Sequence, residues 1–353
     1  TSKDYTAYFQ QVPKQHLAQM MQLEADRMRH LSLDPDAFEQ EIKVVMEERR
    51  LRTDDQPQSL LFEAMNAMAF QTHPYRRPII GWMNDLENMT VKDARDWYER
   101  WYVPNNAYVV VVGDVDHKEV FRMAEKYYGP LKSRPLPLRK PQDEPLQKGV
   151  RRLTVKAPAE LPVVMMGYRA PIIRDVEKDI DPYALEMLSA IFSGHGAARF
   201  SKNLVREQRL AISAGAEYDA TARGPGMFYL IGTPSEGKTV VEMEAGLRAE
   251  VVRVQAEGVT AEELSRARTQ LVAAEIYKLD SMFAQAMEIG QLDSVGLPYR
   301  SGERIIEKLK AVTTEQVQDV AKRYFGDDSL TVGVLDPQPL EGVPRRPAAN
   351  VRH

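Results

Sequence analysis

An internal repeat constrains the fold of this chain more than any other feature of its sequence. The segment 89–115 (MTVKDARDWYERWYVPNNAYVVVVGDV) aligns with 312–338 (VTTEQVQDVAKRYFGDDSLTVGVLDPQ), and the tripeptide PYR recurs at 74–76 and 298–300 with nearly the same offset. Repetition at this scale indicates a duplicated structural unit. We therefore predict two homologous halves, each ending in a helix, an aromatic pair, a short turn and a β-branched strand.

A proline-rich segment, 129–149, separates the two halves. Its five prolines exclude a helix and favour an extended, semi-rigid connector. We predict one domain over 1–128 and a second over 150–353. Strands expected at 211–219 and 226–234 follow each other without an intervening helix, which favours antiparallel pairing. The predicted fold class is α+β, with an antiparallel sheet and packed helices in each half.

The composition narrows the functional classes. The 353 residues carry a net charge of −4, and 43% of them are hydrophobic, which is typical of a folded protein and gives no reason to expect a nucleic-acid partner. The apolar runs at 107–113 and 161–168 are strand-length, so we expect no membrane span. Cysteine is absent, so any metal would bind to His, Asp or Glu.

Two acids, Glu41 and Glu48, lie seven residues apart in EIKVVMEERR (41–50). Asp34 followed by Pro35 predicts the start of a helix, and seven steps on a helix place both acids on one side. Two interpretations fit this spacing. The acids could form surface ion pairs, such as Glu48 with Arg52, or they could bind a cation.

The acids belong to one half only, because the positions that align with them in the second half are Ala267 and Ala274. Duplicated proteins with unequal halves often keep their chemistry in one copy, which favours the cation. The six histidines are scattered, however, and none are four residues apart. The residues of this chain therefore cannot complete a zinc site by themselves.

Several stretches together resemble the pitrilysin and insulinase class of zinc metallopeptidases, in the bacterial branch related to mitochondrial processing peptidases. They are TSKDYTAYF (1–9), EIKVVMEERR (41–50), HPYRRPIIGW (73–82) and FSGHGAARFSKNLVREQRLA (192–211). The resemblance runs essentially from end to end. It implies two α+β halves and a peptide or unfolded polypeptide as substrate.

In that family a His-x-x-Glu-His helix supplies two zinc ligands and a general base, and a later glutamate completes the site. The resemblance makes Glu48 this third ligand, and Glu41 an acid that supports the site without contacting zinc. No His-x-x-Glu-His occurs in the 353 residues. By resemblance it belongs just upstream of Thr1, so we expect the first half to be incomplete at its N-terminus and the chain to be inactive alone.

The resemblance also assigns a role in the second half, where the family often supplies an Arg and a Tyr that contact the substrate. Arg206 occupies the Arg position, whereas Ile212 falls at the Tyr position and has no donor. This combination suggests a zinc-bearing subunit with a homologous partner subunit. The alternative is a noncatalytic structural or peptide-binding subunit. Bacterial relatives are often exported, so we expect a periplasmic location.

Overall fold

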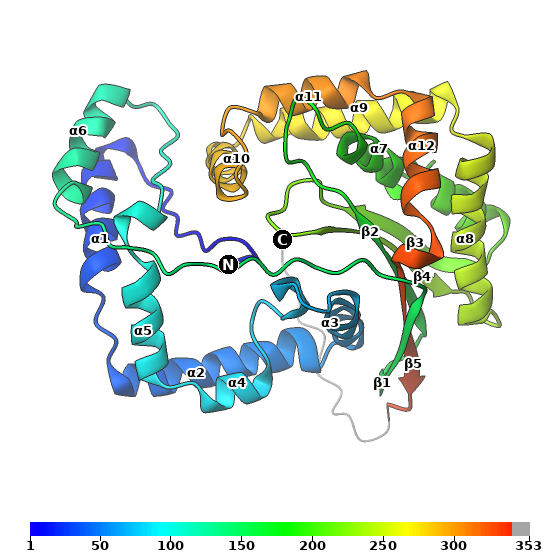
Figure 1. The fold of residues 1–353 in the computed structure, drawn as a ribbon, viewed down its shortest axis with the longest axis horizontal. Helices are drawn as coiled ribbons and strands as arrows, with labels where there is room; N and C mark the ends of the chain where they lie inside the picture. The colour runs from blue at the N-terminus through cyan, green and yellow to red at the C-terminus, as the bar shows by residue number, and fades with distance from the viewer. Residues whose placement is uncertain (341–353) are drawn as a thin grey trace.

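The computed structural model describes residues 1–340, which form a largely helical first part beside a second part built around one sheet (Figure 1). The helices of the first part are α1 (Leu17–His30), α2 (Pro35–Arg49), α3 (Pro57–Ala69), α4 (Met83–Asn88), α5 (Val91–Trp101) and α6 (His117–Tyr128). Those of the second part are α7 (Asp181–Ser193), α8 (Val240–Glu257), α9 (Ala261–Lys278), α10 (Met282–Ser294), α11 (Gly302–Ala311) and α12 (Thr314–Tyr324). Within residues 1–340, none of the helices has both the length and the apolar character needed to span a membrane.

Short polar side chains fix where the main helices begin. The carboxylate of Asp34 accepts hydrogen bonds from the backbone N–H groups of residues 36 and 37, each at 3.0 Å, and Pro35 follows as the first helical residue. Thr90 before α5 and Thr313 before α12 each form a capping box with the third residue of their helix. The aligned repeat therefore starts its helix by the same device in both copies.

One five-stranded sheet forms the core of the second part. Its strands are β1 (Arg151–Pro158), β2 (Val163–Ala170), β3 (Ala211–Tyr218), β4 (Gly226–Pro234) and β5 (Leu330–Gln338), in the order β1-β5-β2-β4-β3. The antiparallel pairing predicted for 211–219 and 226–234 is confirmed by β3 and β4. The sheet is mixed, however, because β1 pairs with β5 in parallel.

Helices cover both faces of this sheet, and they come from different parts of the chain. Alternate residues of β2 point to opposite faces. Val164 and Met166 belong to the large core formed with α7, α8 and α12. Val163 and Met165 belong to a smaller core with Leu61 and Met65 of α3. The first part thus contributes α3 to the sheet of the second, where β2 is buried on both faces.

The α+β fold class is confirmed, but the first part differs from the expectation of a sheet in each half. Within residues 1–340, no strand occurs before β1. The β-branched run at 107–113 is extended without forming a ladder, whereas its aligned copy in the second half is β5. An extended segment becomes a strand only when a neighbour pairs with it, and β5 has two such neighbours, β1 and β2.

The proline-rich segment 129–149 contains neither helix nor strand, as predicted, and its carboxylate Glu144 ties it to the loop after α3. This side chain is only 5% exposed. It accepts hydrogen bonds from the backbone N–H groups of Gln71, Thr72 and His73 at 2.6, 2.9 and 2.9 Å. Arg169 of β2 forms an ion pair with it at 2.9 Å. Glu144 therefore joins the connector, the first part and the sheet at one point.

Candidate functional site

Glu48 lies in the last turn of α2 and is accessible to solvent. Its side chain is 41% exposed and forms an ion pair with Arg52 at 2.8 Å. Such an exposed i,i+4 pair contributes only about 0.3–0.5 kcal/mol. Glu41 lies about two helical turns earlier and is exposed, and its side chain has no hydrogen bond or ion pair with any of residues 1–340. The surface ion pair is therefore present, but it is too weak to keep Glu48 from a stronger cation.

Arg49, the residue after Glu48, holds this end of α2 rigidly. Its guanidinium is 6% exposed and makes two hydrogen bonds to the carboxylate of Glu63 on α3, at 2.8 and 3.0 Å. It also donates to the carbonyl oxygen of Gly81 at 2.8 Å. Donating hydrogen bonds to the Glu63 carboxylate raises the pKa of Arg49 above its ordinary value, against the effect of burial. The turn that carries Glu48 is thus fixed to α3 and to the loop before α4.

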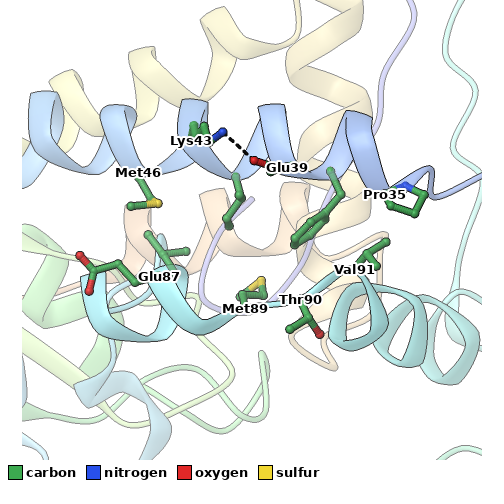
Figure 2. A pocket seen from close by; sticks show the side chains of 11 residues that line it. Pro35, Glu39, Lys43, Met46, Glu87, Met89, Thr90 and Val91 are labelled. Atoms are coloured by element: carbon green, nitrogen blue, oxygen red, sulfur yellow. Dashed lines mark hydrogen bonds and ion pairs between the residues drawn. The ribbon is translucent and has the colours of Figure 1, made fainter.

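A separate flank of α2 lines a groove of about 380 Å³ against α4 and the start of α5 (Figure 2). Its walls are mostly apolar, and its lining includes Phe38, Ile42 and Met46 of α2. The ion pair of Glu39 with Lys43, at 2.9 Å, lies along its rim. Neither Glu41 nor Glu48 contributes to this lining. The groove is therefore distinct from the surface that carries the two predicted acids.

Arg206 lies on η5 (Phe200–Glu207), a π-helix between α7 and β3. It is exposed, and its Nη1 donates to the carbonyl oxygen of Gly196, in the glycine-rich turn, at 2.6 Å. Ile212 on β3 is 52% exposed and offers no polar group. No hydrogen bond or ion pair among residues 1–340 joins Arg206 to α2. The two predicted site residues, Glu48 and Arg206, therefore lie on separate elements without direct contact.

The described residues do not form a metal site by themselves. No group of three or more His, Asp or Glu side chains that could hold a metal ion occurs within residues 1–340. Glu48 is one carboxylate, whereas a zinc ion in a protein requires at least three protein ligands. The donors present here do not fit zinc unless further ligands are added, in agreement with the absence of His-x-x-Glu-His from the sequence.

Comparisons with known proteins decide the family. A family model described as insulinase, peptidase family M16, matches residues 1–82. A second, described as the peptidase M16 inactive domain, matches residues 88–271, which is more than half of the chain. The chain belongs to the M16 peptidase family. The two matches meet upstream of the proline-rich segment, so the domain boundary at 129–149 stays a prediction.

Individual M16 relatives cover nearly the whole chain. The zinc protease PqqE of Helicobacter pylori is 31% identical over 350 residues, which are 96% of this chain and 75% of that protein. The crystal structure of a protease from Helicobacter pylori matches with a TM-score of 0.86 at 27% identity, and covers 92% of this chain and 78% of that one. The periplasmic protease PqqL from Escherichia coli matches with a TM-score of 0.76 at 17% identity, over 92% of this chain and 37% of that one. This last match shows the fold alone.

The buried polar residues next to the candidate site residues were not predicted from the sequence. Arg49 lies in a run of basic residues after Glu48 that gives no sign of which one is buried, yet Arg49 is buried and Arg50 is exposed. Asn203 and Arg199 in the second half are likewise buried at 8% and 9% exposure. A usable signal was present: Asn203 interrupts the apolar i,i+4 pair Phe200 and Leu204, and a polar residue on such a face needs a buried partner.

Proposed function

We propose that the natural protein to which this chain belongs is a zinc-dependent metalloendopeptidase. The observation that carries the proposal is the match of residues 1–82 to the insulinase family, which includes Glu48 on a rigidly held and solvent-accessible turn. The relative PqqE, named a zinc protease, adds support. In this proposal Glu48 is one zinc ligand, and histidines outside the 353 residues supply the others. Zinc, when bound, supplies an activated water.

Glu41 and Arg206 have supporting roles in this proposal. Glu41, about two helical turns before Glu48 on the same side of α2, adds negative charge beside the metal without contacting it. Arg206 donates N–H groups to the backbone carbonyl oxygens of an extended peptide, because it is exposed and is held beside a glycine-rich turn that a peptide can approach closely. The substrate is a peptide or an unfolded polypeptide.

The test compares Glu48→Gln with wild type in the natural protein purified from its source. We expect zinc content to fall and chelator-sensitive peptide hydrolysis to drop by about 100-fold or more, since losing even an outer partner of a ligand costs about 10–100-fold. Glu39→Gln on the same helix is the matched control, because Glu39 pairs with Lys43 on the other flank. Full zinc and activity in the Glu48→Gln protein would refute the assignment.

A second candidate function is a noncatalytic subunit that binds peptides or supports a homologous M16 partner. Two observations favour it: Ile212 has no donor, and residues 88–271 match a model described as an inactive domain. Binding of an extended peptide by this chain without metal, together with no zinc in the natural protein, would favour this function. We also propose a periplasmic location, because PqqL, which shares this fold, is a periplasmic protease.

A further inference from the structure

The helix that carries Arg206 has an unusual register. Over Phe200–Glu207 the chain forms a π-helix, and the backbone N–H of Gln208 donates to the carbonyl oxygen of Asn203, five residues earlier, at 2.9 Å. Arg209, directly after it, has a positive φ of 50°. A π-helix of this length is rare, and such segments occur frequently at functional sites. Some other interaction must therefore stabilise this register against the α-helical one.

A buried polar pair supplies that interaction. Asn203 donates from its Nδ2 to Oε2 of Glu250 on α8 at 2.9 Å, and Glu250 is fully buried. Arg253 forms an ion pair with the other oxygen of Glu250 at 3.1 Å. A buried carboxylate is costly unless it is paired and hydrogen-bonded. The pair therefore holds residue 203 against α8, at the point where the π-helical hydrogen bond to Gln208 begins.

The start of the π-helix is held separately. The guanidinium of Arg199 makes two hydrogen bonds to Glu263 on α9, at 2.7 and 2.9 Å, and a third to the carbonyl oxygen of Gly258 at 3.0 Å. Because Arg199 and Asn203 are both held in place, the number of residues per helical turn that follows them determines the direction in which the Arg206 side chain points. An α-helical register would rotate Arg206 around the axis, away from the carbonyl oxygen of Gly196.

We infer that Asn203, through its hydrogen bond to Glu250, is a positioning residue that aims Arg206 at a bound peptide. The inference rests on the proposed role of Arg206 in peptide binding. Asn203 itself is buried at 8% exposure and does not touch the peptide. Its effect on affinity must therefore pass entirely through Arg206, and this requirement separates a positioning role from a general contribution to folding.

The experiment is a double-mutant cycle on this chain with N203L, R206A and the double variant. The probe is a fluorescein-labelled peptide from β-casein, and its Kd is measured by fluorescence anisotropy without metal. We expect R206A to weaken binding by about tenfold, the size of one charge-assisted hydrogen bond. N203L should weaken binding by a similar factor when Arg206 is present, and should change nothing in the R206A background.

Two controls keep the result interpretable. N203L/E250L replaces both buried partners by apolar groups, so it removes the pair without leaving a buried carboxylate that could prevent folding. It should bind as weakly as N203L while its Tm stays near that of wild type. E207Q changes an exposed residue of the same π-helix and should bind like wild type.

The contrary outcomes are distinct. If N203L and N203L/E250L bind the peptide like wild type, or if N203L weakens binding equally with and without Arg206, the positioning role is wrong while the proposed role of Arg206 stands. If R206A binds as tightly as wild type, the proposed role of Arg206 itself is wrong, and the inference falls with it. Loss of hydrolysis in a Glu48→Gln protein bears on neither result.

Discussion

At the scale of single residues, the surroundings shift the pKa values of two glutamates, Glu186 and Glu263, in opposite directions. Burial raises the pKa of Glu186 on α7 to about 7, and the nearby carboxylates of Asp219 and Glu275 add to the effect. The backbone N–H of Ala220 and the charge of Lys278 oppose it only in part. Glu263 is also desolvated, but hydrogen bonds from Arg199 and the Thr260 cap lower its pKa to about 2. The two pKa values differ in direction because Glu263 has a hydrogen-bonded, positively charged partner, Arg199, and Glu186 does not.

Glu186 should make stability depend on pH. Its pKa in the folded protein lies above its unfolded value, so folding binds a proton, and the free energy of unfolding falls as pH rises from about 4.5 to about 7. The full effect is at most about 3 kcal/mol. In Glu186→Gln this contribution to the slope should vanish, as measured by urea unfolding between about pH 5 and about pH 8.

The control for this prediction is Glu257→Gln, an exposed acid at the end of α8, which should keep the wild-type slope. An unchanged pH dependence in Glu186→Gln would mean that the pKa of Glu186 is the same in the folded and the unfolded protein.

At the scale of elements, α3 is the part of the first half that the second half depends on. Leu61 and Met65 are fully buried on the face of the sheet opposite α7, α8 and α12. The sheet accepts them closely because Gly333 of β5 has no side chain: a Cβ there would lie 2.9 Å from Leu61 and 2.8 Å from Met65. The close approach of α3 to β5 thus depends on glycine at 333.

Leu61→Ala should therefore destabilise the protein strongly. Removing a buried leucine side chain costs about 2–5 kcal/mol, depending on how far the site relaxes. Leu51→Ala is the matched control, because Leu51 is 44% exposed and its truncation should change the free energy of unfolding by less than about 0.5 kcal/mol. Equal effects of the two substitutions in urea unfolding would show that α3 does not form a common core with the sheet.

Local signals and long-range contacts differ in how well the sequence predicts them. The cap at Asp34, the antiparallel pair β3 and β4, and the connector 129–149 follow from neighbouring residues and were predicted. The parallel pair β1 and β5 and the packing of α3 on the sheet join residues far apart in the chain, so no local pattern indicates them. Glu48 and Arg206 were assigned by family resemblance, and their roles remain proposals.

At the scale of the whole molecule, the two parts are joined by more than the chain itself. Arg169, besides pairing with Glu144, donates to the carbonyl oxygen of Ala69 at 2.6 Å and lies over the ring of Phe70, 4.2 Å from its centre. Backbone hydrogen bonds and Arg169 lower the pKa of Glu144 in spite of its burial. The connector is thus fixed near its C-terminal end by Glu144, and near its N-terminal end the backbone of Arg134 exchanges two hydrogen bonds with the side chain of Asn105, at 2.9 and 3.1 Å.

Glu144→Ala should release this connector. The variant leaves three backbone N–H groups and Arg169 without their shared acceptor, so the amides of residues 71–73 should lose protection from hydrogen exchange and trypsin should cleave faster after Arg139. The matched control is Asp143→Ala, since Asp143 is exposed and only its backbone carbonyl accepts a hydrogen bond, from the hydroxyl of Thr72.

The two possible outcomes differ clearly. If the first and second parts move relative to each other by bending anywhere along 129–149, both Glu144→Ala and the control should be cleaved at the wild-type rate. If Glu144 restricts that motion, only Glu144→Ala should be cleaved faster, and the exchange of β2 and β4 in the centre of the sheet should stay unchanged.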